Sequence, residues 1–343
     1  MSFKAFEGDD FVVSADSITA PLWTGNQPTL TQFFTSSAQQ AGSTGQYFLS
    51  VYQTGSTLQG SEDQFDIVYG NKFGSGSILY STAVPGKSPT STIYGQYRTL
   101  VNGDENTDFT FGNSNSSITA TEFYGLSISR NRYKEALFPG SLTLTLTSGS
   151  NSITLTDDSV VSTTIVFKDA GRVFQLVSGS AGSVNTSKQA NGYTVGSGSY
   201  GWLLPDIGTI LLNPLALTAS VADGGMAFNT NRSNNSDGGN TTRLFAAISG
   251  GMSFTMNSQE TITADYIFVR PRSSEFNYSE NPSYISGSTG EVIYSNFINN
   301  PTTYITTVGL YNDSNDLLAV AKLSRPLKKD FTKETLIRVK LDF

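Results

Sequence analysis

Ser141-Leu142-Thr143-Leu144-Thr145-Leu146-Thr147 alternates apolar and polar side chains without a break. Successive side chains of a β-strand point to opposite faces of its sheet, so the alternation predicts a strand with one face in a core and the other near solvent. The same spacing returns at 153–155 and 163–167, after turn residues at 149–151 and 157–158. Together these segments predict a β-meander.

Strand patterns continue from this meander towards both ends of the chain. They lie at 46–52, 64–70, 172–177, 200–212, 261–270, 303–311, 317–323 and 337–343. β-Branched and aromatic side chains fill these segments, and residues that favour turns lie between neighbours. The pattern predicts hairpins over 46–70 and 303–323, and a buried strand pair over 200–212 that bends at Pro205-Asp206.

The composition agrees with a chain built from strands. Of the 343 residues, 37% are hydrophobic and 12% aromatic, which is enough for a core, while only 14% are charged against about 25% in an average globular domain. The 33 glycines and 16 tyrosines suit strands joined by tight turns. We predict an all-β protein of antiparallel β-sandwich or meander domains, with long loops and only short helices.

Three regions are expected along the chain. Residues 1–140 form an N-terminal β domain that carries an extended, mostly irregular arm at about 74–100. Residues 141–250 form a middle β-meander domain, which is compatible both with an inserted domain and with a continuation of the same sandwich. Residues 251–343 form a C-terminal β-hairpin region that packs with the N-terminal domain.

Histidine and cysteine do not occur anywhere in the chain. Their absence excludes Ser-His-Asp and Cys-His catalysis and the usual zinc sites. Two carboxylates are sufficient for glycoside hydrolysis, which leaves Glu62, Asp63, Asp66 and Glu122 as candidates, although the sequence does not pair any two of them. We expect a protein that is not an enzyme and that has no cofactor and no catalytic residue.

Two motifs resemble ligand sites but are better explained as turns. Gly196-Ser-Gly198-Ser-Tyr-Gly201 has the spacing of a dinucleotide loop, but Pro205 follows too closely for a normal helix to begin there. Asp104-Glu-Asn106-Thr-Asp108 has the first ligand positions of a calcium loop, with Phe109 where glycine is required. We expect no metal site, with a weakly bound Ca²⁺ at the second turn left open as an alternative.

Charge is distributed unevenly. The net charge is −7, but seven basic and three acidic residues give the last 22 residues a net charge of +4, against −11 in residues 1–321. Such a basic end can dock head to tail on an acidic body, and it can equally be a solvated edge whose lysines discourage strand addition. The acidic total disfavours direct nucleic-acid binding.

The chain has no apolar run of signal-peptide or membrane-span length, so we expect synthesis in the cytoplasm and no membrane span.

The segment 74–100 is the strongest candidate for an inter-subunit arm. It is rich in glycine and proline, yet it keeps the large side chains of Tyr80, Ile93, Tyr94 and Tyr97. Loops of this length inside compact domains are usually functional, and side chains of this size favour packing against a neighbour.

Several short strings resemble one protein family. In the first half of the chain they are Asp16-Ser-Ile-Thr-Ala-Pro-Leu-Trp23, Phe33-Phe-Thr-Ser-Ser37, Tyr69-Gly-Asn-Lys72, Ile93-Tyr-Gly-Gln-Tyr97, Ser129-Arg-Asn-Arg-Tyr-Lys-Glu135 and Pro139-Gly-Ser-Leu142. In the second half they are Ser274-Glu-Phe-Asn-Tyr-Ser-Glu-Asn-Pro282, Val308-Gly-Leu-Tyr-Asn-Asp313 and Leu318-Ala-Val-Ala-Lys-Leu-Ser-Arg-Pro326. The chain resembles virion structural proteins of T4-like contractile-tailed phages, particularly those of cyanobacteria. The resemblance extends over most of the chain, apart from 178–199 and 223–243.

This resemblance implies a tail or baseplate component of the virion, assembled in symmetric copies with other virion structural proteins as partners. It carries no catalytic residues. We expect the arm, the segment 274–284 and the basic end to contact neighbouring subunits. The predicted interface residues are Tyr80, Ile93, Tyr94, Tyr97, Phe276, Tyr278, Tyr284, Arg325, Lys328 and Lys329. The alternatives are a capsid or neck protein, and a tail protein that contacts the host surface by binding a receptor or by binding or cleaving a glycan.

Overall fold

The computed structural model describes residues 3–23, 34–40, 46–52, 62–77, 79–81, 83–84, 87–113, 116–187, 192–194, 196–229 and 238–342. The protein is mostly β, with large antiparallel sheets and four short α-helices among these residues. The predicted all-β class is confirmed.

The chain forms two compact units. Unit 1 consists of Met1–Ser17 and Thr261–Phe343, and unit 2 is Ile18–Glu260. The expected boundary near residue 140 does not appear in this division. Strands from both sides of it belong to one sheet, since Leu126 and Ile210 are partners in adjacent strands. The C-terminal residues instead share a unit with the first residues of the chain.

Unit 2 contains a twelve-stranded sheet. Its main strands, in spatial order, are β16 (Phe254–Thr255), β9 (Thr143–Ser148), β10 (Asn151–Asp157), β12 (Gly171–Ser180), β14 (Gly201–Leu204), β15 (Thr209–Leu212), β7 (Glu122–Ile128), β4 (Asp63–Asn71), β3 (Gln46–Tyr52) and β2 (Phe34–Gln40). The short strands β11 (Val166–Lys168) and β13 (Ser183–Val184) pair with β12. The predicted hairpin of β3 and β4 and the predicted pair of β14 and β15 are both confirmed.

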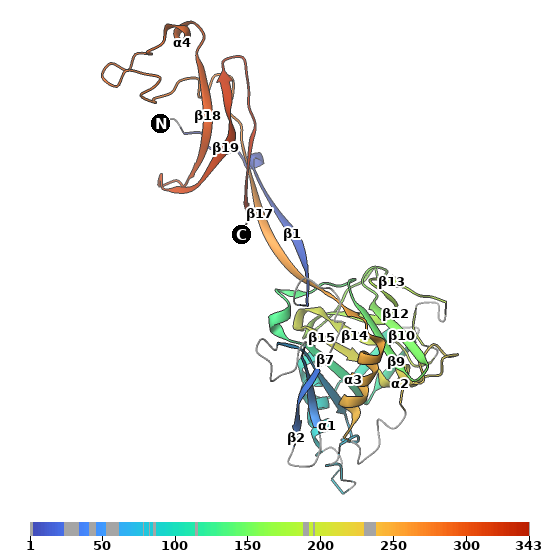
Figure 1. Cartoon of the computed structure of the whole chain (residues 1–343). Helices are drawn as coiled ribbons and strands as arrows, with labels where there is room; N and C mark the ends of the chain where they lie inside the picture. The colour runs from blue at the N-terminus through green and yellow to red at the C-terminus, as the bar shows by residue number, and fades with distance from the viewer. Residues whose placement is uncertain are drawn as a thin grey trace. The chain divides into compact units, whose positions relative to one another are not determined.

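The central strands of this sheet are buried on both faces. On β15, Ile210 and Leu212 belong to one core, while Leu211 between them belongs to another. The first core lies under α3 (Asn240–Gly251) and α2 (Pro214–Thr218), and the second under α1 (Pro89–Asn102) and the hairpin of β5 (Phe109–Asn113) and β6 (Ser116–Ala120). Figure 1 shows α3 in front of β9. Continuous apolar runs are therefore expected here in place of alternation.

The expectation of an irregular arm is wrong for the second half of 74–100. Residues 89–102 form α1, which packs on β4. Pro89 occupies the first turn, and Gly103 ends the helix with a φ of 74°. Proline fits a first helical turn and glycine fits a left-handed C-cap, so both helix signals were present in the sequence. Ile93, Tyr94 and Tyr97 have helical spacing and turn their side chains towards the sheet.

Unit 1 is a smaller assembly of strands. β17 (Asn257–Val269) pairs with β1 (Phe11–Pro21) on one side and with β20 (Ile337–Asp342) on the other, and β8 (Ala136–Leu137) pairs with the start of β17 in unit 2. β18 (Thr302–Tyr311) and β19 (Leu317–Asp330) form the predicted C-terminal hairpin, which is confirmed. Ile267 of β17, Leu310 of β18 and Val339 of β20 form a small core between the two layers. The remaining described helices are η1 (Gly8–Asp10), η3 (Arg130–Arg132), η4 (Pro205–Ile207) and α4 (Ser295–Asn299).

Candidate assembly surface

Three ion pairs join the N-terminal residues 3–10 to residues 270–275, which belong to the same unit. Lys4 Nζ lies 2.9 Å from Glu275 Oε2, Arg272 Nη2 lies 3.3 Å from Glu7 Oε1, and Arg270 Nε lies 3.0 Å from Asp10 Oδ1. The pairing order shows that 3–10 and 270–275 run in opposite directions. The sequence contained these charges, but it gave no signal that joined two segments more than 250 positions apart.

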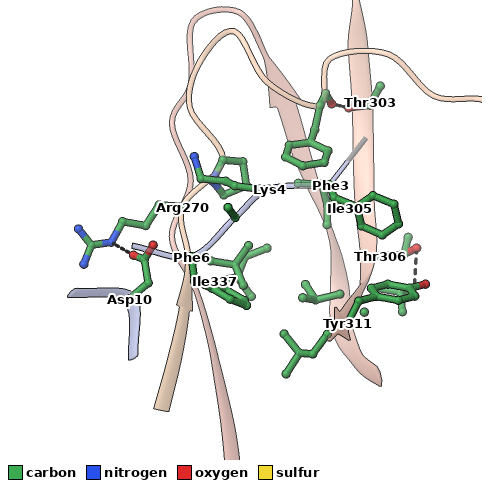
Figure 2. Close-up of a pocket in the computed structure, with 18 of the residues that line it drawn as sticks. Phe3, Lys4, Phe6, Asp10, Arg270, Thr303, Ile305, Thr306, Tyr311 and Ile337 are labelled. Carbon is green, nitrogen blue, oxygen red and sulfur yellow. Dashed lines mark hydrogen bonds and ion pairs between the residues drawn. The ribbon is translucent and has the colours of Figure 1, made fainter. Parts of the chain in front are cut away.

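An open groove of about 1230 Å³ runs beside this N-terminal segment. Figure 2 shows Phe3 of the N-terminal segment on the side of Ile305 and Tyr311 of β18, and Phe6 beside Ile337 of β20. The rings of Phe3 and Tyr311 meet edge to face, with centroids 5.1 Å apart. The groove also holds polar groups, including the Asp10–Arg270 ion pair. Its walls therefore offer apolar rings beside charged and hydroxyl groups.

Unit 1 exposes many large apolar side chains outside its small core. They are Phe3, Phe6, Phe11, Val12, Val13, Tyr278, Ile293, Tyr294, Ile298, Tyr304, Tyr311, Leu317, Leu318, Val320, Phe331 and Leu336. On β19, Leu318 is 68% exposed and Val320 is 59% exposed. Exposed apolar patches of this kind mark interaction sites in soluble proteins. We call this set of residues the apolar surface of unit 1.

Two of the predicted interface residues lie in the segment 274–284 and line the groove. Phe276 is half-buried there and Tyr278 is exposed, whereas Tyr284 is buried within unit 1. The rings of Tyr278 and Tyr284 meet nearly at right angles, with centroids 5.9 Å apart. Phe276 has a φ of 56°, which is strained for a bulky residue. Phe276 and Tyr278 thus line one groove and Tyr278 also contacts Tyr284, and the role of these three residues at a subunit interface stays a prediction.

The predicted basic residues of β19 have different environments. Arg325 and Lys328 are exposed, and Lys328 Nζ lies 3.5 Å from Asp330 Oδ2. Lys329 is fully buried, and its Nζ donates to Ser273 O and Asn277 Oδ1, each at 2.9 Å, and to Asp330 O at 3.1 Å. Within this chain, Lys329 therefore ties β19 to the loop 273–277.

The four predicted arm residues belong to unit 2, and none of them lines the groove of unit 1. Tyr94 is buried, and its hydroxyl donates to Ala120 O at 2.8 Å. Burial first, and the Asp108 carboxylate second, raise the pKa of Tyr94. Ile93 and Tyr97 are half-buried and line a second pocket of about 570 Å³, and Tyr80 is half-buried in the preceding segment. Tyr94 is thus a core residue of its own unit, and no contact of these four residues with a neighbour is tested by the structure.

Two of the four candidate carboxylates, Asp66 and Glu122, lie on opposite faces of the sheet. The Tyr69 hydroxyl donates to Glu122 on the α3 side of the sheet, whereas Asp66 lies on the α1 side. Burial raises the pKa of Asp66, and burial raises that of Asp158 to about 6. Asp158 follows β10, which lies five strand spacings from β4, or about 24 Å. A glycosidase needs two carboxyl groups within roughly 10 Å.

The two sequence motifs are turns in the structure. Gly196 and Gly198 have positive φ values of 73° and 70°, and strand β14 follows them in place of a helix. Asp104 Oδ1 accepts hydrogen bonds from the backbone N–H groups of Asn106 at 2.5 Å and Thr107 at 2.7 Å. Among the described residues there is no cluster of three acidic side chains that could hold a metal ion.

Searches against protein-family models, curated proteins and solved structures each found no match to this chain. None of the helices in the described part of the chain combines the length and the apolar character needed to cross a membrane.

Proposed function

We propose that this chain is a structural component of a contractile-tailed phage virion, in the tail or baseplate, and that it assembles into a symmetric homo-oligomer through unit 1. The observation that supports the proposal is the apolar surface of unit 1. It has sixteen exposed large side chains among the described residues, whereas the core cluster of this unit has three buried members. The resemblance to virion proteins of T4-like phages supports the assignment to the tail or baseplate. The function is mechanical and requires no catalytic residue.

The energetics of burial favour association. Burying an exposed leucine or valine side chain contributes roughly 1.5–3 kcal/mol. Leu318 and Val320 lie on the same strand with their side chains in solvent. A neighbouring subunit that covers them gains this free energy, while a lone chain leaves it unused. A capsid or neck protein would use the same surface, and immunogold labelling of virions with an antibody to this chain would distinguish these positions from the tail.

Sedimentation velocity of the purified chain tests the proposal. We expect the natural protein to form a discrete oligomer and the double variant Leu318→Thr with Val320→Thr to shift to monomer, because threonine keeps the strand propensity and removes apolar area. The control is Val84→Thr with Val221→Thr, which changes two exposed apolar side chains of unit 2. A natural chain that stays monomeric at all concentrations, alone and with other virion proteins, would exclude self-assembly.

A second candidate function is glycan binding by the groove. Exposed aromatic rings such as Tyr304 line it beside charged groups, and aromatic faces with adjacent polar groups suit sugar rings. We expect Tyr304→Ala to abolish binding to host surface polysaccharide in calorimetry if the groove has this role. Tyr294→Ala, an exposed tyrosine outside the groove, serves as the control.

A further inference from the structure

The three-stranded sheet of unit 1 ends in two open edges. β17 is its central strand, with β1 on one side and β20 on the other. No other strand in the described part of the chain pairs with the outer edge of β1 or of β20. An open edge presents a row of unpaired backbone N–H and C=O groups, which is a template for pairing with another chain.

The edge strand β1 has no protection against such pairing in its unit 1 part. Phe11, Val12 and Val13 are consecutive and all exposed, with Val13 at 59%. Since consecutive side chains point to opposite faces, both faces of β1 lack a cover. Residues 11–17 contain neither lysine nor proline, the residues that natural edge strands commonly use to prevent strand addition.

The opposite edge is electrostatically complementary. In its unit 1 part, residues 11–17, β1 carries one charged side chain, the exposed Asp16. β20 exposes Arg338 and Lys340, and in the described part of the chain Arg338 has no ion pair. Asp342 first, and Asp16 more weakly, raise the pKa of Lys340, which places Asp16 and Lys340 near the same face of the sheet. An apolar edge with one carboxylate and an edge with two exposed basic side chains thus lie on opposite sides of one sheet.

The C-terminal hairpin is a poorer site for strand addition. The middle of β19 carries Lys322, Arg325, Pro326 and Lys328. Proline removes a backbone donor, so Pro326 interrupts the row of N–H groups that an added strand would need, whereas β20 contains no proline. The groove and the N-terminal segment lie along β18. The edges of β1 and β20 are therefore the better sites for the addition of a strand from another chain.

We propose that β1 of one copy adds to β20 of a second copy, so that the three-stranded sheets of neighbouring subunits join edge to edge. The inference rests on the self-assembly proposed above and assigns its contact. The two edges differ, so the interface is heterologous, and repeated copies form a ring if the rotation between subunits closes or a filament if it does not. Each copy then contributes one β1 edge and one β20 edge, and the exposed residues of β1 meet the next subunit.

Engineered disulfides test this contact, because the natural chain has no cysteine. Within one chain β1 and β20 are separated by β17, about 9.6 Å from edge to edge, and a disulfide needs Cα atoms within about 7 Å. Any disulfide between the two strands must therefore join two chains. Val12→Cys, Ser14→Cys and Asp16→Cys, each combined with Lys340→Cys, place both thiols on one face and step through the possible registers.

Mild oxidation of the full chain and non-reducing gel electrophoresis give the readout. We expect at least one of the three pairs to form covalent multiples of the 36.8 kDa chain that disappear on reduction. Val13→Cys with Lys340→Cys places the thiols on opposite faces and serves as the matched control, which should stay monomeric on the gel. Ile267→Cys with Val339→Cys are register partners within one chain and control for oxidation.

The other outcomes overturn the inference in distinguishable ways. Covalent dimers from Val12→Cys alone would indicate that two β1 edges pair with each other. An oligomer in sedimentation velocity with no cross-link in any of the three pairs would place the interface elsewhere and leave the proposed function standing. A chain that is monomeric in sedimentation as well would remove both proposals.

Discussion

Lys329 is the residue on which the C-terminal part of unit 1 most clearly depends. Its ammonium group is fully buried and meets three oxygen acceptors, from Ser273, Asn277 and Asp330. A buried cation is tolerated only when its hydrogen bonds are satisfied, and here each N–H of the ammonium has an acceptor. The neighbouring Lys328 is exposed. Of these two adjacent lysines, Lys329 therefore forms hydrogen bonds in the interior, whereas Lys328 lies at the surface.

We expect Lys329→Met to destabilise unit 1 by roughly 1–3 kcal/mol, because it removes the ammonium that Asn277 Oδ1 accepts from, whereas Ser273 O and Asp330 O keep the N–H donors of Asn277 and Lys333. Hydrogen exchange followed by mass spectrometry should show faster exchange over 273–277 and 326–330. Lys328→Met is the matched control and should change exchange little, since the Lys328 ammonium is exposed and such surface ion pairs contribute less than about 1 kcal/mol. Equal protection in the two variants would contradict the role assigned to Lys329.

At the scale of elements, α1 depends on a close approach to the sheet. A Cβ atom added at Gly70 of β4 would lie 2.7 Å from the Phe123 ring and 3.2 Å from the Tyr94 Cα atom. Gly70 therefore lets the helix backbone lie directly over the strand. Gly95, one residue after Tyr94 in α1, has no heavy atom within 4 Å of the corresponding position.

The same substitution should have opposite effects at these two glycines. Gly70→Ala is expected to lower the free energy of unfolding of unit 2 by roughly 1–3 kcal/mol through overpacking. Gly95→Ala is expected to raise it by about 0.5–1 kcal/mol, because alanine restricts the unfolded chain and favours a helix interior. Urea denaturation followed by tryptophan fluorescence measures both, since Trp202 belongs to the core that α1 covers. A loss of stability at Gly95 would show that α1 packs differently.

At the scale of the whole molecule, the two units differ in how they are stabilised. Unit 2 has extensive cores on both faces of its sheet, whereas the core cluster of unit 1 has three buried members. Both tryptophans, Trp23 and Trp202, lie in unit 2. Tryptophan fluorescence therefore reports on the unfolding of unit 2 alone.

We expect two thermal transitions in circular dichroism. The one from unit 2 coincides with the change in tryptophan fluorescence and does not depend on protein concentration. The one from unit 1 is silent in fluorescence and moves to higher temperature as protein concentration rises, because association stabilises the folded state by mass action. A concentration-independent transition of unit 1 would indicate that this unit is stable without a neighbour.

The sequence by itself determined the all-β class, the hairpins of β3 with β4 and β18 with β19, and the bent pair β14–β15. Local alternation and turn residues encode these features, because a strand and its nearest partner are close in sequence. It also contained the helix signals Pro89 and Gly103, although the density of glycine and proline led to an expectation of an irregular arm.

Only the tertiary structure decided which residues lie inside. Lys328 and Lys329, or Tyr278 and Tyr284, are alike in sequence, but one of each pair is buried and the other exposed. The tertiary structure also decided the division into two units, the joining of residues 3–10 to 270–275 and the open edges of β1 and β20. These features depend on contacts between segments far apart in the chain, and local periodicity carries no information about such pairings.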